Sequence, residues 1–425
     1  MTNGHRPTPS RHAPTVAAHK RQARRARRPD MEFRFDYRPG TVRYGAGCVD
    51  ALGDELAALG ADDALVVTGR TVGETAAVME PVRAGLGDRL AVEFAETTLE
   101  KRFETAVAGD ERLAATGADA VVAVGGGSSL NVAKVMVALA AAGEPATLRN
   151  DFEATGAVAV PDGELLPIAT VPTTLAGADL STIAGITARR GGELVWGGAY
   201  DERLMPAALL YDPELFRTTP HGVLCGSAMN GFDKAVETAY ASTATPIIDG
   251  TAVRALRLLS RGLPALGDGD RDDGTMHDAV VGTILAQYGC SRADGLTLSL
   301  IHAFGHGIAR GYDVQQGGAH AIVAPHALRY LFERVDGRRD LLAEGLGVEG
   351  GSGDPDATAE AVVGRVEAVR DALGLPTRLR DVGDMVESDL PDVAEDVADD
   401  GLLPYCPDGL EPIADELEAV LREAW

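Results

Sequence analysis

The feature that most limits the fold of this chain is an alternation of short apolar runs and helical stretches between residues 64 and 142. The runs at 64–69, 92–96 and 118–127 have the length and composition of buried strands. Helical spacing follows each of them, at 74–86, 102–116 and 130–142. Strands that alternate with helices form parallel βαβ units. Since LPIATVPTT at 166–174 reads as a further strand, we predict an α/β domain with a parallel sheet.

The pattern changes at about Pro213, where strand signals vanish and amphipathic helical spacing takes over to Trp425. The first 30 residues differ from both parts, since they are basic, rich in Pro and Ala, and without apolar periodicity. The chain is therefore predicted to contain a disordered basic tail at 1–30, an α/β domain at 31–213 and an all-helical domain at 214–425.

The charge of the chain excludes some partners. A formal net charge of -25 and a pI near 4.7 argue against affinity for nucleic acid or anionic membranes, which attract basic surfaces. No apolar run approaches the ~20 residues that span a bilayer. Four scattered cysteines without a CxxC pair indicate neither a zinc knuckle nor a disulfide framework. We expect a cytoplasmic protein that binds a small molecule. Acidic excess with few lysines also suggests a halophilic host; an acidic protein from an ordinary GC-rich genome is the alternative.

A glycine-rich turn, Gly125, Gly126 and Gly127, ends a buried strand and directly precedes a helix. Glycines let the backbone approach a pyrophosphate, and the helix start offers unpaired N–H groups. The turn matches neither GxGxxG nor Walker A. We interpret it as an anion cradle, with a tight turn that binds nothing as the alternative.

Lysine is scarce, since only four of the 39 basic residues are lysines, yet Lys134 and Lys234 stand in GGGSSLNVAK and AMNGFDKAVE. A lysine ammonium is a compact point charge, whereas arginine forks its donors. A lysine retained in such a segment suggests that an ammonium is required there.

Five ordered motifs resemble the iron-containing alcohol dehydrogenase superfamily, whose members carry GGGSxxDxAK followed by a PTT turn. The matching segments are GGGSSLNVAK with PTTLAGADLS, VRYGAGCVDALGDEL at 42–56, DERLMPAALLYDPEL at 201–215, AMNGFDKAVETAYAS at 228–242, and 301–330. The resemblance implies a Rossmann-like nucleotide-binding domain followed by an all-α catalytic domain, as in dehydroquinate synthases. It also makes a homodimer possible, because dimers are common among relatives.

Within the superfamily the chain looks most like the maleylacetate reductases. Their turn reads PTTxAGSE, one residue shorter than PTTxGTGSE, and PTTLAGAD has the shorter spacing with Asp179 in place of Glu. The motif on their metal-site helix also begins with Asn rather than Asp, and Asn230 stands at that position here.

Most of the metal site that the resemblance would imply is missing. Typical members bind an ion through Asp and His four apart, a His in HxxxH, and a His 14 residues later. The matching residues are Asn230, Lys234, His302 and Gln316. Neutral amides are poor ligands for a borderline transition metal, and a lysine ammonium has no lone pair to give. We therefore expect no bound iron or zinc.

Lys234 is the natural substitute for the ion. Spacing of four places it on the helix face of Asn230, where its ammonium could polarise a carbonyl or stabilise an alkoxide. His302 would bind substrate or orient Lys234, and His306 would give or take the proton. Gln316 and His320 are expected to contact substrate. The alternatives are a surface or ion-paired lysine and structural histidines.

The expected cofactor is NAD(P). Members that prefer NAD carry an Asp after the second strand, but Gly69 stands there with Arg70 beside it, which favours NADP over NAD. Asn131 stands where the superfamily's GGGSxxDxAK motif has Asp. This exchange weakens any contact with the ribose or the substrate that the resemblance implies for that position. The residues predicted to bind the cofactor are Gly69, Arg70, Gly125, Gly126, Gly127, Ser128, Asn131, Lys134, Thr173, Thr174 and Asp179.

These observations predict a metal-independent NAD(P)-dependent oxidoreductase that acts on a small alcohol, aldehyde or keto acid. One alternative is a metal-dependent alcohol dehydrogenase with an unusual Asn, His and Gln ligand set, which would bind Fe or Zn. Another is a lyase similar to dehydroquinate synthases, although their site motifs are not matched, and a third is a noncatalytic nucleotide-binding protein.

Overall fold

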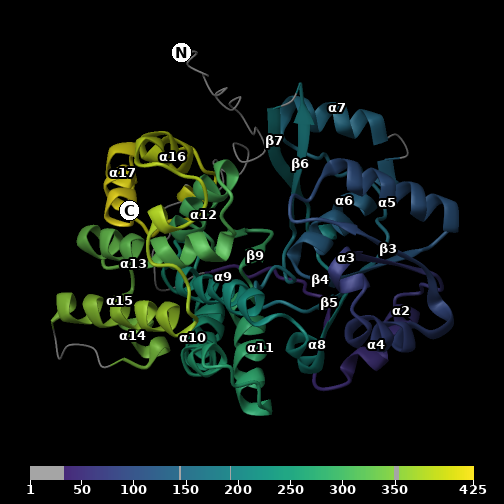
Figure 1. Cartoon of the computed structure of the whole chain (residues 1–425), viewed down its shortest axis with the longest axis horizontal. Coiled ribbons are helices and arrows are strands. Elements are labelled where there is room, and N and C mark those ends of the chain that lie inside the picture. The colour runs from purple at the N-terminus through teal and green to yellow at the C-terminus, as the bar shows by residue number, and fades with distance from the viewer. Residues whose placement is uncertain (1–32, 143–144, 192, 349–353) are drawn as a thin grey trace. The chain divides into compact units, whose positions relative to one another are not determined.

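The computed structural model describes residues 33–142, 145–191, 193–348 and 354–425, so the predicted basic tail at 1–30 lies outside the described residues. The described chain divides into two compact units (Figure 1). One contains Arg38–Thr173 and Ser181–Asp212, and the other contains 33–37, Thr174–Leu180 and Pro213–Trp425. The segment Thr174–Leu180 therefore packs with the second unit although it follows a strand of the first.

The first unit is built on a six-stranded sheet in the order β1-β8-β5-β4-β2-β3. Every neighbouring pair in it is parallel, as the alternation of strands and helices predicted. The central strands are almost wholly buried. The strands are β1 (Thr41–Tyr44), β2 (Ala64–Gly69), β3 (Leu90–Thr97), β4 (Ala120–Gly125), β5 (Ile168–Pro172) and β8 (Ala208–Tyr211).

Helices cover this sheet. α6 packs on β4 and β2, α5 packs on β3, and α2 packs on β8. Valine and leucine side chains of the strands and of α6 form the core between them. The helices are α2 (Leu52–Ala58), α3 (Arg70–Gly73), α4 (Ala76–Leu86), α5 (Phe103–Thr116), α6 (Gly127–Ala142) and α7 (Pro145–Thr155).

An antiparallel hairpin, β6 (Ile183–Arg190) and β7 (Glu193–Tyr200), also belongs to this unit and was not predicted. Glycine weakens the strand signal, and Gly197 and Gly198 stand in the second strand. They are there because the backbone is crowded: a Cβ added to Gly197 would lie 1.7 Å from the carbonyl oxygen of Gly156.

The second unit is mainly helical, as predicted. Its helices are α8 (Pro213–Arg217), α9 (His221–Tyr240), α10 (Pro246–Gly267), α11 (Asp273–Gln287), α12 (Leu300–Gly311), α13 (Gln316–Arg334), α14 (Arg339–Leu346), α15 (Pro355–Ala372), α16 (Leu390–Ala398) and α17 (Ala414–Glu423). The expectation that strands vanish after residue 213 was wrong in one detail. β9 (Ser291–Arg292) and β10 (Gly295–Leu296) form a two-stranded sheet, but two residues each are too few to leave a periodic pattern. None of the helices in the described part of the chain combines the length and the apolar composition that a membrane span requires.

Candidate active site

The first unit places several predicted cofactor-binding residues at one edge of its sheet. Gly69 ends β2, Gly125 ends β4, and Thr173 follows β5. β2 pairs with β4 and β4 pairs with β5, all parallel, so the three carboxyl ends are adjacent. Ligands of open α/β sheets bind at this edge. Arg70, the first residue of α3, is exposed there.

The glycine-rich turn joins β4 to α6. Gly125 has φ +121°, a conformation that side chains disfavour, and its carbonyl accepts a hydrogen bond from the N–H of Thr173 at 3.0 Å. α6 begins at Gly127, and Gly126, Gly127 and Ser128 are only half-buried. A helix start preceded by glycines and open at its end fits the phosphates of a dinucleotide.

Lys134, another residue predicted to bind the cofactor, lies in the middle of α6. The residue is wholly buried, and its Nζ donates to the backbone carbonyls of Ser181 at 2.5 Å and Ile183 at 3.1 Å. This ammonium therefore ties α6 to the start of β6. Asn131 lies half-buried, three residues earlier on the same helix.

The turn after PTT packs on the helix that carries Lys234. Gly177 has φ +64°, and a Cβ there would lie 3.3 Å from Cδ of Lys234, so the turn covers the lysine stem. Thr174 is half-buried. Asp179 is buried, and its carboxylate accepts from Nε2 of Gln287 at 3.3 Å, while the backbone N–H of Asp179 donates to Oε1 of Gln287 at 2.9 Å.

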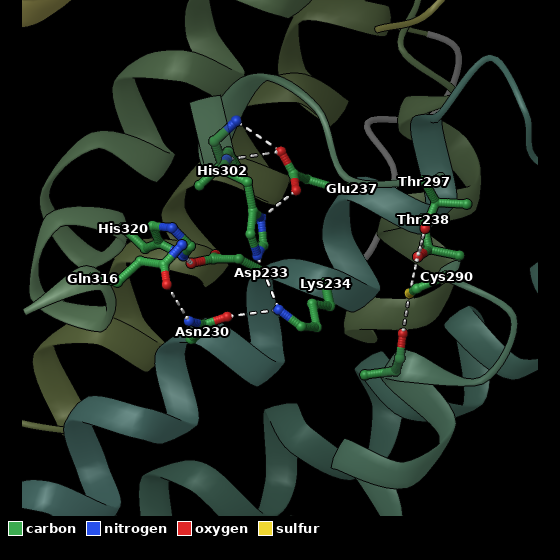
Figure 2. Close-up of polar contacts among 12 residues, drawn as sticks. Asn230, Asp233, Lys234, Glu237, Thr238, Cys290, Thr297, His302, Gln316 and His320 are labelled. Carbon is green, nitrogen blue, oxygen red and sulfur yellow. Dashed lines mark hydrogen bonds and ion pairs between the residues drawn. The ribbon is translucent and has the colours of Figure 1, made fainter. Parts of the chain in front are cut away.

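The four residues that match the superfamily's metal ligands do converge in the second unit (Figure 2). Nζ of Lys234 lies 2.7 Å from Oδ1 of Asn230 and 3.0 Å from Nε2 of His302. Nδ2 of Asn230 donates to Oε1 of Gln316 at 3.4 Å. Asn230 and Lys234 come from α9, His302 from α12 and Gln316 from the first turn of α13. The sequence thus predicted which residues meet.

Burial shapes the electrostatics of this cluster. It lowers the pKa of Lys234, an effect that the neighbouring Cys290, Glu237, Asp233 and Asp179 oppose. It also lowers the pKa of His302 well below its usual range, and the Lys234 charge adds to this shift. The histidine is therefore neutral at neutral pH, so that its ring can accept a hydrogen bond from the lysine.

Glu237 was missed by the sequence analysis, although it touches this cluster. Its Oε2 lies 2.5 Å from Nδ1 of His302, and the side chain is completely buried. A signal for it existed: residues 230, 234 and 237 have the i, i+4, i+7 spacing of one helix face. Its partner lies 65 residues further along the chain, which no local pattern reveals.

His320 is buried beneath the cluster. Its ring lies edge-on to that of His302 at 4.4 Å between centroids, and Nδ1 is 3.4 Å from Oδ2 of Asp233. A Cβ at Gly305 would lie 2.2 Å from Nε2 of His320, so a glycine is needed where α12 passes this ring. With no exposed surface, His320 supports the cluster from within, and a direct substrate contact stays a prediction.

His306, the predicted proton donor, lies one turn after His302 on α12 and is about one-third exposed. Nδ1 of His306 lies 3.0 Å from Oδ2 of Asp400, which Arg310 also approaches at 3.1 Å. Burial raises the pKa of Asp400, but His306 and Arg310 outweigh this and keep the carboxyl ionised. An imidazole held at Nδ1 by a carboxylate keeps Nε2 for proton exchange.

The donor set does not fit a transition metal. Nζ of Lys234 lies within hydrogen-bonding distance of both Asn230 and His302, so it fills the space that an ion bound by these two residues would need. An ammonium repels a cation, and two neutral amides replace a carboxylate and an imidazole. Across the part of the chain that the structure describes, no three His, Cys, Asp or Glu side chains are grouped as ligands.

Comparison with known proteins places this architecture in a family. Residues 39–213 match the family described as iron-containing alcohol dehydrogenase, and residues 225–425 match the C-terminal part of the Fe-containing alcohol dehydrogenase family. The maleylacetate reductase of Pseudomonas aeruginosa is 30% identical over 395 residues, which cover 93% of this chain and 98% of that protein. The NAD-dependent methanol dehydrogenase of Bacillus methanolicus is 28% identical over 378 residues, 85% of this chain and 92% of that protein.

A solved structure of 1,3-propanediol oxidoreductase has the same fold, with a TM-score of 0.82 at 23% identity over 92% of this chain and 100% of that one. The chain therefore belongs to the iron-containing alcohol dehydrogenase family, in its maleylacetate reductase-like branch. It is an oxidoreductase of the dehydrogenase and reductase type, and the resemblance inferred from its motifs is confirmed.

Proposed function

We propose that this protein is an NAD(P)-dependent reductase of a small aldehyde, ketone or keto acid, working without a metal ion. The observation that carries the proposal is the position of Lys234, whose Nζ lies between Asn230 and His302. A fixed cation can replace a Lewis acid where negative charge develops on a carbonyl oxygen. The maleylacetate reductase among the relatives supports an acidic substrate.

In this mechanism Lys234 donates a hydrogen bond to the substrate carbonyl and stabilises the alkoxide that forms. A bound nicotinamide supplies the hydride. The imidazolium of His306, whose Nδ1–H faces Asp400, then gives the alkoxide its proton from Nε2 and becomes a neutral ring. Alcohol oxidation uses the same groups in reverse.

The glycine-rich turn and Ser128 would hold the pyrophosphate. Gly69 and Arg70 favour NADP(H) over NAD(H), because no carboxylate stands at the end of β2 to repel a 2′-phosphate. Asn131, Thr173, Thr174 and Asp179 are the other proposed cofactor contacts, whereas Lys134 would act by holding α6 in place. Cytoplasmic location, a homodimer and adaptation to high salt stay predictions.

The experiment that tests this function measures metal content and turnover in one preparation. We expect less than stoichiometric iron and zinc, and oxidation of NADPH faster than of NADH with members of a panel of aldehydes and keto acids. Prolonged treatment with a chelator should leave the rate unchanged. One tightly bound ion per chain, with activity lost on chelation and restored by iron or zinc, would establish the metal-dependent alternative instead.

The rate should also fall on the alkaline side of the pH profile. Burial lowers the pKa of Lys234, so the active ammonium loses its proton at a pH below the usual pKa of about 10.4. We therefore expect kcat to decrease as pH rises through the lowered pKa of Lys234. Carbonyl reduction consumes a proton, so high pH slows this direction even when no enzyme group titrates. Alcohol oxidation releases a proton and therefore serves as the control. If the rates of reduction and of oxidation both fall above the same pH, a group of the enzyme loses a proton that both directions need. An oxidation rate that keeps rising to pH 10 would argue against titration of Lys234.

A further inference from the structure

The side chain of Glu237 has tyrosine, backbone and histidine partners in the second unit, and the hydroxyl of Tyr240 donates to its Oε1 at 3.3 Å. Its Oε1 accepts hydrogen bonds from the backbone N–H groups of Ile301 at 2.7 Å and His302 at 3.2 Å, at the start of α12. Its Oε2 faces Nδ1 of His302 at 2.5 Å (Figure 2). The carboxylate thus serves a helix start and an imidazole together.

These contacts determine which ring nitrogen of His302 carries the hydrogen. An ionised carboxylate only accepts hydrogen bonds, so Nδ1 must be the protonated nitrogen and donate to Oε2. Burial raises the pKa of Glu237 to about 7, while the backbone N–H groups of His302 and Ile301 act in the opposite direction. At pH 8 the carboxylate is ionised and this assignment of hydrogens applies.

The assignment continues to Lys234. With its hydrogen at Nδ1, the neutral ring has a lone pair at Nε2, which lies 3.0 Å from Nζ. A protonated lysine can donate three hydrogen bonds and can accept none. One points to Nε2 of His302 and one to Oδ1 of Asn230 at 2.7 Å, which leaves the third for a substrate oxygen.

We propose that Glu237 is a positioning residue for the reaction: it holds His302 as the Nδ1–H tautomer, so that Nε2 accepts from Lys234 and fixes the charged ammonium. This inference rests on the proposed function of Lys234. Without Glu237 the opposite tautomer would direct an Nε2–H at the ammonium, and two donors would face each other.

Glu237→Gln separates this role from support of the helix. The amide oxygen still accepts from the two backbone N–H groups, because only the oxygen can, so the amide nitrogen must face His302. Its N–H donates to Nδ1 and moves the ring hydrogen to Nε2. Lys234 must then lose its charge or move away.

The test combines histidine ¹⁵N NMR at pH 8 with kinetics, and a His302→Gln variant assigns the His302 signals. We expect protonated Nδ1 and bare Nε2 in the wild type, the reverse in Glu237→Gln, a fall in kcat of roughly 10- to 100-fold, and unchanged affinity for nucleotide. Glu360→Gln makes the same chemical change at an exposed site of α15 and should alter neither readout.

Each other outcome overturns the proposal. A hydrogen found at Nε2 of His302 in the wild type would do so, and this result does not depend on whether the variant folds. A hydrogen that stays at Nδ1 in Glu237→Gln would also do so. The same holds for a variant in which the tautomer is reversed but kcat is unchanged. The proposed function is tested separately: it is wrong if a variant without Lys234 keeps its turnover. The tautomer of His302 measured by NMR would remain valid in that case.

Discussion

Replacing Lys234 with methionine is expected to lower kcat for carbonyl reduction by about 10²- to 10³-fold, the usual cost of removing one donor that stabilises an oxyanion. Methionine keeps the length and most of the volume of the stem beneath Gly177 but lacks the charge. Asn230 and His302 lose the donor that lies 2.7 Å and 3.0 Å from them. Turnover is followed by nucleotide oxidation, and nucleotide affinity by titration.

Affinity for nucleotide should stay near the wild-type value, because the glycine-rich turn and the residues at the carboxyl ends of the sheet are untouched. Thr238→Val is the control for damage to α9. Its hydroxyl contacts Thr297 at 2.8 Å and Cys290 at 3.1 Å rather than Lys234, so this variant should retain turnover. A Lys234→Met enzyme with near-normal kcat would reject the role assigned to the lysine.

The large features of the fold followed from the sequence because periodicity and glycine placement act locally. The strands at 64–69 and 120–125 are buried on both faces, so their continuous apolar runs identified them. The hairpin of β6 and β7 was missed, because glycines that permit close backbone contact also weaken the strand pattern.

The site was predictable in composition but not in its hydrogen bonds. The motif spacing brought Asn230, Lys234, His302 and Gln316 together correctly, since each matched a position of a known motif. Glu237 and Asp400 were not found, because each acts on a histidine 65 or 94 residues away. Such partners are set by the packing of α9 and α16 on α12, and a single sequence holds no record of that packing.

Rebuilding the family's ligand set should convert this protein into a metal binder. The variant Asn230→Asp, Lys234→His, Gln316→His supplies a carboxylate and two imidazoles around His302, whose Nε2 already points into the cluster. Glu237 would hold Nδ1 of His302, as carboxylates commonly do behind a metal-bound histidine. Zinc accepts such nitrogen and oxygen ligands at about 2.0–2.2 Å. We expect one zinc ion per chain after loading and gel filtration, and no stoichiometric metal in the wild type.

Two controls make the result specific to the lysine-for-metal exchange. Lys234→Met removes the repelling charge without adding a ligand, so it should stay metal-free, and His302→Gln in the triple variant should abolish binding. Zinc bound equally by the wild type would mean that the ammonium yields to an ion, and the metal-independent function would be wrong. Zinc bound only by the triple variant would show that a few side chains around His302 decide whether this fold uses an ion or an ammonium at the same place.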